Sequence, residues 1–185
     1  MTSLVILGII AAVILYGITI YNRLVRNRQM VQEGWSGIDV QLKKRANLIP
    51  NLVAAVKGYM KHERGLLEKI TELRAKAQGM DNATPAERSA VEQEISRVLG
   101  QINVAVENYP DLKANQNVLD LQQQLAQIEH DIQMARRYYN GAVRENNVLV
   151  ESFPSNLIAN YFHFEKAEYF ELENPEDRAV PKVEL

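Results

Sequence analysis

The sequence contains no cysteine, only 3 histidines and few turn-forming residues, with 9 Gly and 6 Pro in 185 residues. The lack of cysteine excludes disulfide frameworks, thiolate zinc sites, iron–sulfur clusters and cysteine nucleophiles. Three histidines leave little scope for imidazole chemistry, and the shortage of turn formers argues against an all-β chain of many short strands. The length suits one domain of ordinary size. An all-α fold is what these absences favour.

The net charge is only -2, but the basic and acidic residues are distributed unevenly along the chain. Residues 23–76 hold 12 Lys+Arg against 5 Asp+Glu, whereas residues 77–185 hold 9 against 18. The chain is therefore electrically polarised, with its basic segment next to an apolar N-terminus. We expect the basic and acidic segments to pair with each other, within one chain or between subunits.

The first 22 residues form a long apolar run, in which LVILGIIAAVILYGITI extends from Leu4 to Ile20 and Arg23 is the first charged side chain. As a helix, the 18 residues from Leu4 to Tyr21 would extend about 27 Å, close to the hydrocarbon thickness of a thin bilayer. A cleavable signal peptide is disfavoured because no basic residue precedes the run and no small-x-small site follows it. A buried core helix is disfavoured because such helices are seldom apolar on every face. Residues 1–22 are therefore predicted to be a transmembrane anchor.

Flanking charge predicts the orientation of this anchor. No Lys or Arg precedes the apolar run, whereas Arg23, Arg26 and Arg28 follow it directly. The positive-inside rule places these arginines in the cytoplasm and the N-terminus outside. We predict a single-pass protein of the inner (cytoplasmic) membrane with a cytoplasmic C-terminal domain. The same three arginines lie near enough to the headgroups to be predicted lipid-contact residues.

The rest of the chain is predicted to be helical, with interruptions at residues 78–83 and 108–111. Thr84, Pro85 and Glu87 form a strong helix start, with Thr as N-cap, Pro at the first helical position and Glu closing a capping box. A second long helix is expected to begin near Leu112. Its apolar positions keep steps of 3 and 4, which predicts left-handed packing against other helices. These positions are Val118, Leu121, Leu125, Ile128, Ile132, Ala135, Tyr139, Ala142, Asn146, Leu149 and Phe153.

The segment that follows the anchor has the same spacing, through Leu24, Val31, Trp35, Ile38, Leu42, Ala46, Ile49, Val53, Val56 and Met60. One step departs from the heptad at Ala46. Pro50 lies four residues later and crowds that carbonyl, so a kink is expected there. The pattern leaves open whether this segment is one bent helix or two straight ones. A straight helix longer than its partners would need neighbouring subunits to cover its apolar seam, which is a first indication of self-association.

Four seam residues are candidates for packing and assembly, namely Trp35, Ile38, Leu42 and Asn146. Asn146 has two interpretations. In one it is a polar residue near a frayed helix end that reaches water. In the other it is a buried amide that sets the register of the helices.

Seven stretches of the chain form a recognisable pattern in a fixed order, at residues 21–25, 33–45, 47–53, 56–59, 107–115, 135–140 and 153–156. This pattern resembles the LemA family across nearly the whole chain. The resemblance implies an N-terminally anchored bacterial membrane protein with a long-helix, four-helix-type bundle, and it implies no reaction. Family members are often encoded near membrane peptidases. The usual pattern has Ala where Gly34 stands here, and we expect the glycine to loosen the helix beside Trp35.

Searches for catalytic and metal-binding patterns find none. His62-Glu63 lacks the second histidine that a zinc hydrolase needs four residues on, since position 66 is Leu. His62, His130 and His163 fall in different elements, so structural or surface roles are expected. Glu129-His130 has the wrong spacing for a di-iron bundle. No nucleophile-elbow serine or phosphate-binding glycine loop occurs, so we predict no enzymatic activity and no catalytic, cofactor-binding or metal-binding residue.

Lys43-Lys44-Arg45 is the only run of three basic residues. It has no interleaved aromatic residues and belongs to no recognised motif, so no nucleic-acid partner is predicted. The cluster lies too far beyond the anchor to contact lipid on a straight helix. We expect it to face water or the acidic face of another helix.

The sequence as a whole predicts an all-α protein whose N-terminal transmembrane helix continues into a long-helix antiparallel bundle of the four-helix type. Its parts are the anchor (1–22), a LemA-like helical bundle (23–160) and a short extended acidic tail (161–185). The predicted function is a non-enzymatic, membrane-anchored scaffold that self-associates, aided by the small residues Gly8 and Ala12 in the anchor. The expected partners are membrane lipids, further copies of the chain and a membrane protein. The alternative is an adaptor or regulator of a membrane peptidase or signalling sensor, and a more remote one is a hydrolase with an unrecognised polar site.

Overall fold

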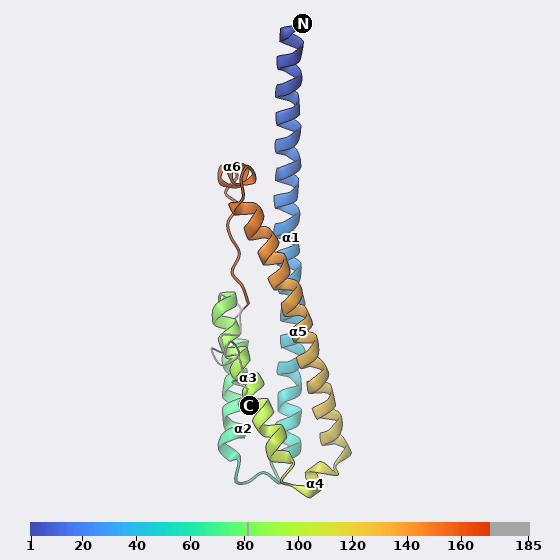
Figure 1. The fold of residues 1–185 in the computed structure, drawn as a ribbon. Coiled ribbons are helices and arrows are strands. Elements are labelled where there is room, and N and C mark those ends of the chain that lie inside the picture. Colours follow the sequence, from blue (N-terminus) through green and yellow to red (C-terminus); the bar gives the residue numbers. More distant parts are fainter. Residues whose placement is uncertain (81, 171–185) are drawn as a thin grey trace, which may run out of the picture. The chain divides into compact units, whose positions relative to one another are not determined.

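The computed structural model describes residues 1–80 and 82–170 of the chain. Most of these residues lie in six helices, and no strand occurs among them, so the all-α prediction is confirmed (Figure 1). The helices are α1 (Thr2–Val56), α2 (Arg64–Gln78), α3 (Pro85–Val106), α4 (Pro110–Lys113), α5 (Gln116–Glu151) and α6 (Ser155–Tyr161). Of the predicted tail, residues 171–185 lie outside the described part.

The first helix, α1, is a single helix of 55 residues that continues through Pro50. A proline inside a helix leaves the carbonyl four residues earlier without its usual backbone donor. Here that carbonyl belongs to Ala46, and the Nε of Arg74 in α2 donates a hydrogen bond to it at 2.7 Å. A side chain of the neighbouring helix thus replaces the missing bond. Of the two arrangements that the sequence left open, the structure has the single helix.

A turn at residues 57–63 separates α1 from α2. It is not among the predicted interruptions, and that prediction was wrong here. The backbone N–H groups of Tyr59 and Met60 both donate to the carbonyl of Val56 at 3.0 Å, which closes the helix end in a tight turn. Gly58, a poor helix former, lies in the turn. The turn carries the side chain of Met60, which is 1% exposed, into the core.

The start of α3 is as predicted, and the start of α5 is not. Thr84 and Glu87 form the capping box, with the Thr84 backbone N–H donating to the Glu87 carboxylate at 2.9 Å. The residues near Leu112 form only the short helix α4, and α5 begins at Gln116. The reason is Asn115, whose Oδ1 accepts hydrogen bonds from the backbone N–H groups of Asn117 at 3.0 Å and Val118 at 3.4 Å. Asparagine is a favoured N-cap residue.

The described residues divide into two compact units. Residues 1–40 and 132–169 form the first, called the anchor unit here. Residues 41–131 and Phe170 form the second, called the core unit. Helices α1 and α5 each contribute one part to both units.

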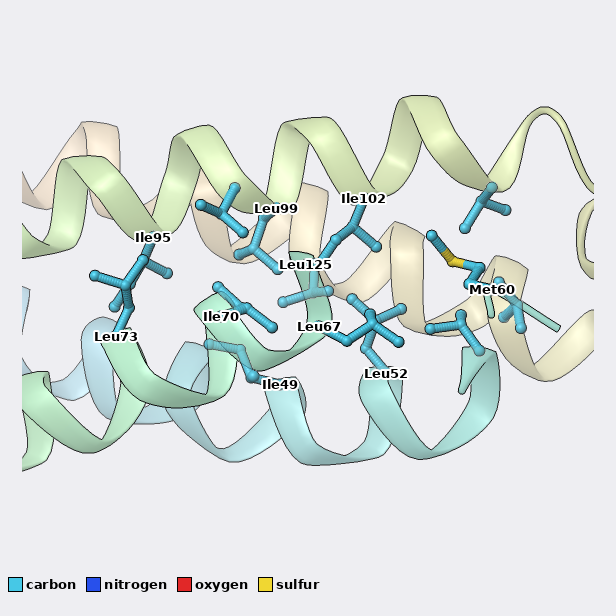
Figure 2. Close-up of a cluster of buried hydrophobic side chains, with 14 of the residues drawn as sticks. Ile49, Leu52, Met60, Leu67, Ile70, Leu73, Ile95, Leu99, Ile102 and Leu125 are labelled. Carbon is cyan, nitrogen blue, oxygen red and sulfur yellow. The ribbon is translucent and has the colours of Figure 1, made fainter. Parts of the chain in front are cut away.

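One hydrophobic cluster holds the core unit together, with side chains from α1, α2, α3 and α5 meeting in the same interior (Figure 2). Burial of apolar side chains is the main stabilising contribution in such a core. Met60 of the turn and Leu112 of α4 complete this cluster. The predicted bundle is therefore confirmed in part, through the shared interior of α1, α2, α3 and α5. Its buried members include Ile49, Leu52, Val56, Met60, Leu67, Ile70, Leu73, Ile95, Leu99, Ile102, Leu112, Val118 and Leu125.

The apolar seams differ from the prediction at two places. In the part of α1 that belongs to the core unit, the buried positions are Leu42, Arg45, Ile49, Leu52 and Val56, which alternate steps of 3 and 4 without a departure. The predicted irregular step at Ala46 was wrong because a charged residue occupies the seam position. The seam of α5 ends before Phe153, whose side chain is 80% exposed and lies beyond the helix.

Candidate membrane-proximal site

The N-terminal part of α1 is long and apolar enough to cross a membrane. It contains an 18-residue window with a mean hydropathy of 2.6, and only 6% of that window is buried. A core helix of a soluble protein would be mostly buried, so the exposure of this segment argues against that interpretation. Large apolar side chains are exposed along it, from Leu4 to Ile18.

Ile20 is the first buried residue of α1. Ile20 and Leu24 are buried in a small cluster with Val150 of α5, Ala159 of α6 and Phe164. Segments that are far apart in sequence therefore meet at the end of the apolar run, where α6 lies beside α1 (Figure 1). This cluster fixes α6, the last helix of the described residues, to α1 at the predicted membrane boundary.

A Schellman motif ends α6 and reverses the chain. The Phe164 N–H donates to the Ala159 carbonyl at 2.9 Å and the His163 N–H donates to the Asn160 carbonyl at 3.3 Å. His163 has a φ of 55°, the left-handed conformation that this motif requires at its turning residue. The contact between Phe164 and Ala159 is the apolar contact that usually accompanies the motif. His163 therefore has a structural role.

Aromatic and basic side chains surround the same boundary. The Tyr21 ring packs edge-on against Phe162, with centroids 4.8 Å apart, and against Phe164 at 5.7 Å. The Arg28 guanidinium lies 5.1 Å from the centre of the Phe164 ring, a cation–π contact. Arg23, Arg26 and Arg28, the predicted lipid-contact residues, are all exposed. Their contact with lipid stays a prediction.

A surface groove of about 600 Å³ opens beside this cluster. Tyr16, Ile20 and Arg23 of α1 line one side of it. Arg144 and Glu145 of α5 contribute opposite charges to its wall, and the residues around Phe153 complete it. The groove thus has a mixed lining of apolar and polar side chains, with two arginines, at the end of the apolar run.

The predicted seam residues Trp35 and Ile38 lie in the anchor unit and Leu42 lies in the core unit. Ile38 and Leu42 are buried, and the half-buried Trp35 ring lies 5.6 Å from the ring of Tyr139 in α5. These side chains pack within the chain itself. Their role in assembly between subunits stays a prediction.

Asn146 is buried, with 3% of its surface exposed, so the interpretation in which it reaches water is wrong. Its Nδ2 donates to the Glu165 carbonyl at 3.3 Å. The neighbouring Asn147 amide binds Ala167 twice, donating to its carbonyl at 2.9 Å and accepting from its N–H at 2.8 Å. The two asparagines therefore hold the segment after α6 against α5, a contact that heptad spacing does not predict.

Tyr139 adds a fourth hydrogen bond to the same segment, because its hydroxyl donates to the Glu168 carbonyl at 2.7 Å. Burial, with the Glu168 charge as a second cause, raises the pKa of Tyr139 to about 12. The phenol therefore stays neutral and keeps its donor proton at all ordinary pH values.

The core unit holds a buried charge cluster formed by Arg45, Arg88, Glu92, Ser96 and Glu129. Arg45 is 1% exposed. Its guanidinium donates to Glu92 at 2.5 Å, to Ser96 at 2.6 Å and to Glu129. Arg88 reaches the other Glu92 oxygen at 3.1 Å. The buried guanidinium is thus paired from α3 and α5, as a charge buried in a protein must be.

Sequence reasoning placed Arg45 in a basic cluster facing water or the acidic face of another helix. Lys43 and Lys44 are exposed, whereas Arg45 meets acidic residues of two other helices. A signal was present, because placing Arg45 and Leu52 on the seam removes the irregular step at Ala46. Within the residues that the structure describes, no group of three or more His, Asp or Glu side chains is placed to hold a metal ion.

Comparison with known proteins finds several whose sequences are similar to that of this chain. A family model described as the LemA family matches residues 34–185. Protein LemA of Metamycoplasma hominis is 27% identical over 166 residues, which cover 89% of this chain and 74% of that protein. Magnetosome proteins MamQ 1 and MamQ 2 of Paramagnetospirillum magneticum are each 23% identical over 176 residues. That match covers 82% of this chain but 64% of each magnetosome protein, less than two thirds of its length.

Proposed function

The chain belongs to the LemA family, and from this premise we propose that it is a non-enzymatic, membrane-anchored helical scaffold that self-associates. One observation carries the proposal most directly. The exposed apolar segment and the helical core share a single uninterrupted helix, α1 from Thr2 to Val56. A helix that spans the bilayer and also packs into the core couples the membrane segment to the core mechanically. Such coupling suits a scaffold that presents a helical bundle at a membrane.

The proposed location is the inner (cytoplasmic) membrane, with the N-terminus outside and the helical units in the cytoplasm. The support is the charge pattern, since Arg23, Arg26 and Arg28 follow the apolar run and no Lys or Arg precedes it. Their exposure suits the proposed contact with anionic headgroups, worth about 1 kcal/mol for each basic residue near the surface. Membrane lipids are thus the first proposed partner.

Self-association is proposed through the anchor. Gly8 and Ala12 lie one turn apart, and no heavy atom of another element lies within 4 Å of the position of a Gly8 β-carbon. Small residues at this spacing let two helix backbones approach closely in a bilayer. The apolar seams of the helices are less suited to contacts between subunits, because Ile38 and Leu42 are already buried within the chain.

Mass measurement in mild detergent tests self-association. We expect masses that are multiples of the 21.0 kDa chain. Gly8→Ile should shift the population toward the monomer because its side chain keeps the backbones apart, whereas the control Ile10→Leu, on the opposite face of the helix, should not. A strict monomer at every concentration would remove the self-association claim.

The alternative is an adaptor or regulator of a membrane peptidase or signalling sensor. A surface groove of about 960 Å³ in the core unit favours it. Val53, Met60 and Leu67 give it an apolar floor, and Arg64 and Glu68 bring charges of both signs to its rim. Such a lining suits an amphipathic helix of a partner. Isolation of the tagged protein from membranes separates the two functions, since the scaffold should recover mainly itself and the adaptor a second membrane protein in fixed proportion.

A further inference from the structure

The connection around α6 exposes an unusual set of large apolar side chains. Phe153 is 80% exposed, Leu157 60% and Tyr161 77%. Leu157 and Tyr161 lie four residues apart in α6, the spacing that places helical side chains on one face, and Phe153 lies in the turn just before α6. These three residues are called the exposed stripe here. Single exposed apolar residues are ordinary on protein surfaces, but a contiguous set of them marks a surface that contacts something apolar.

The position of α6 indicates what that apolar partner is. The Cδ1 of Ile158 lies 3.8 Å from the position of a Gly17 β-carbon, and the ring of Phe162 lies 4.8 Å from that of Tyr21. Gly17 and Tyr21 are at the end of the apolar run of α1. The exposed stripe is therefore held at the level where α1 changes from apolar to basic.

The direction of α6 agrees with this level. Figure 1 shows α6 nearly along its own axis while α1 runs lengthwise in the same view, so α6 lies across α1 rather than along it. A helix that crosses a membrane-spanning helix at its end lies in the plane of the membrane surface. Amphipathic helices in that plane bury their apolar face at the boundary of headgroups and acyl chains.

The chemistry of the stripe and its surroundings fits the same boundary. Tyrosine, with an apolar ring and a polar hydroxyl, is enriched at the headgroup level. Basic groups lie beside the stripe in the 600 Å³ groove, where Arg23 and Arg144 are accompanied by the acidic Glu145. A second acidic group nearby, Glu151, is paired with Lys166 at 2.8 Å. Arginines at this level suit anionic phospholipid headgroups.

We propose that Phe153, Leu157 and Tyr161 form an interfacial foot, which inserts into the leaflet where α1 leaves the bilayer. This rests on the proposed membrane anchoring and adds a second, separate contact with lipid. The foot would hold the anchor unit at the membrane surface at two points, α1 and α6. A single helix alone would leave the unit free to turn and tilt about its anchor.

The chain contains no cysteine, so a single introduced cysteine can carry a fluorescent label without background. The full-length protein is reconstituted into vesicles of phosphatidylcholine and phosphatidylglycerol, with NBD at Leu157→Cys. Ile10→Cys, in the apolar run, reports on the anchor. Met134→Cys is the matched control, because Met134 is an exposed apolar residue of α5 in the same unit, about 24 Å along the helix from Val150.

Lipids with a spin label at a shallow acyl position should quench most of the Leu157→Cys fluorescence and leave Met134→Cys unchanged. Lipids labelled near the chain end should quench Ile10→Cys. If Ile10→Cys is quenched and Leu157→Cys is not, the foot is wrong and the anchoring stands. If neither is quenched, the anchoring fails and the foot with it. If a label at residue 157 disturbs α6, quenching of NBD at Phe153→Cys tests the same insertion from outside the helix.

Discussion

Gly34 lies in α1 opposite Tyr138 and Tyr139 of α5. A β-carbon at this position would meet the Cα of Tyr139 at 3.0 Å and the Cδ1 of Tyr138 at 3.2 Å. The family pattern suggested that glycine here loosens the helix beside Trp35. The structure gives a different role, because the missing side chain lets the two helices approach closely.

Gly34→Ala should therefore destabilise the protein. The new methyl group has to push the Tyr139 backbone away by a few tenths of an ångström, which costs about 1–3 kcal/mol of overpacking, and helix propensity returns about 1 kcal/mol. Gly37→Ala is the matched control on the same helix, because no atom lies within 4 Å of its β-carbon position. That control should be stabilised by up to about 1 kcal/mol. Thermal unfolding in detergent, followed by circular dichroism, would contradict this role if both variants were stabilised.

Tyr139 gives the anchor unit a dependence on alkaline pH. Its pKa is raised to about 12 in the fold, above the unfolded value of about 10. The neutral phenol is favoured in the fold, so its stabilisation is complete below about pH 10 and is lost as the pH rises to about 12. We expect the unfolding free energy of the wild type to fall relative to that of Tyr139→Phe across this window.

Thermal unfolding of both proteins at a series of pH values measures the difference. Tyr59→Phe is a matched control, since the Tyr59 side chain is exposed. Parallel curves for the wild type and Tyr139→Phe from pH 10 to 12 would rule out this account.

The packing of α1 against α3 and α5 in the core unit depends on an ion cluster. Arg45 occupies a seam position, and its charge is balanced by Glu92 and Glu129. Replacing one partner of a buried ion pair leaves an unpaired buried charge, which costs about 3–5 kcal/mol. An exposed pair such as Arg64 with Glu68 contributes about 0–1 kcal/mol.

Arg45→Met should lower the unfolding free energy by about 3–5 kcal/mol, whereas Arg64→Met, the same substitution at an exposed pair, should change it by less than about 1 kcal/mol. Adding Glu129→Gln to Arg45→Met should recover part of the loss, because Arg45 balances the charge of Glu129, whereas Glu92 keeps its ion pair with Arg88. Thermal unfolding of the three variants in detergent tests this. Equal effects of the two arginine substitutions would show that the buried cluster contributes no more to the free energy of unfolding than an exposed ion pair does.

The periodicity of α5 predicted its buried face well, from Val118 to Asn146. The predictions failed at the ends of elements, at Asn115, Phe153 and the turn after Val56. A heptad pattern records which side of a helix is covered but not where the helix stops. Local hydrogen bonds determine the ends, as the Asn115 cap and the Schellman motif at His163 do.

At the scale of the whole molecule, the predicted boundary at residue 22 divides a packed cluster. Ile20 is 4% exposed and packs with Ala159 and Phe164, although it lies within the predicted anchor. The end of the apolar run therefore also completes the interior of the anchor unit, in addition to its predicted role in the membrane. The exposed part of the run ends at Thr19.

Removing residues 1–16 should yield a soluble, largely helical protein, because it deletes most of the exposed apolar run and keeps Ile20. Removing residues 1–22 should lower the thermal stability further and promote aggregation, since Phe164 and Ala159 lose their cover. Gel filtration without detergent and thermal unfolding distinguish the two. Equal solubility and stability of both truncations would contradict a structural role for Ile20.

The sequence by itself determined the helical class, the apolar segment, the family and most of the buried face of α5. These follow from composition, periodicity and local order of residues, which need no knowledge of what each helix packs against. Only the tertiary structure decided which acidic residues pair with Arg45, that Gly34 is a close approach and that Asn146 and Asn147 hold the segment after α6. Each of these depends on a partner far away in sequence, such as Glu129, Tyr139 or Ala167, and such pairings carry no local signal.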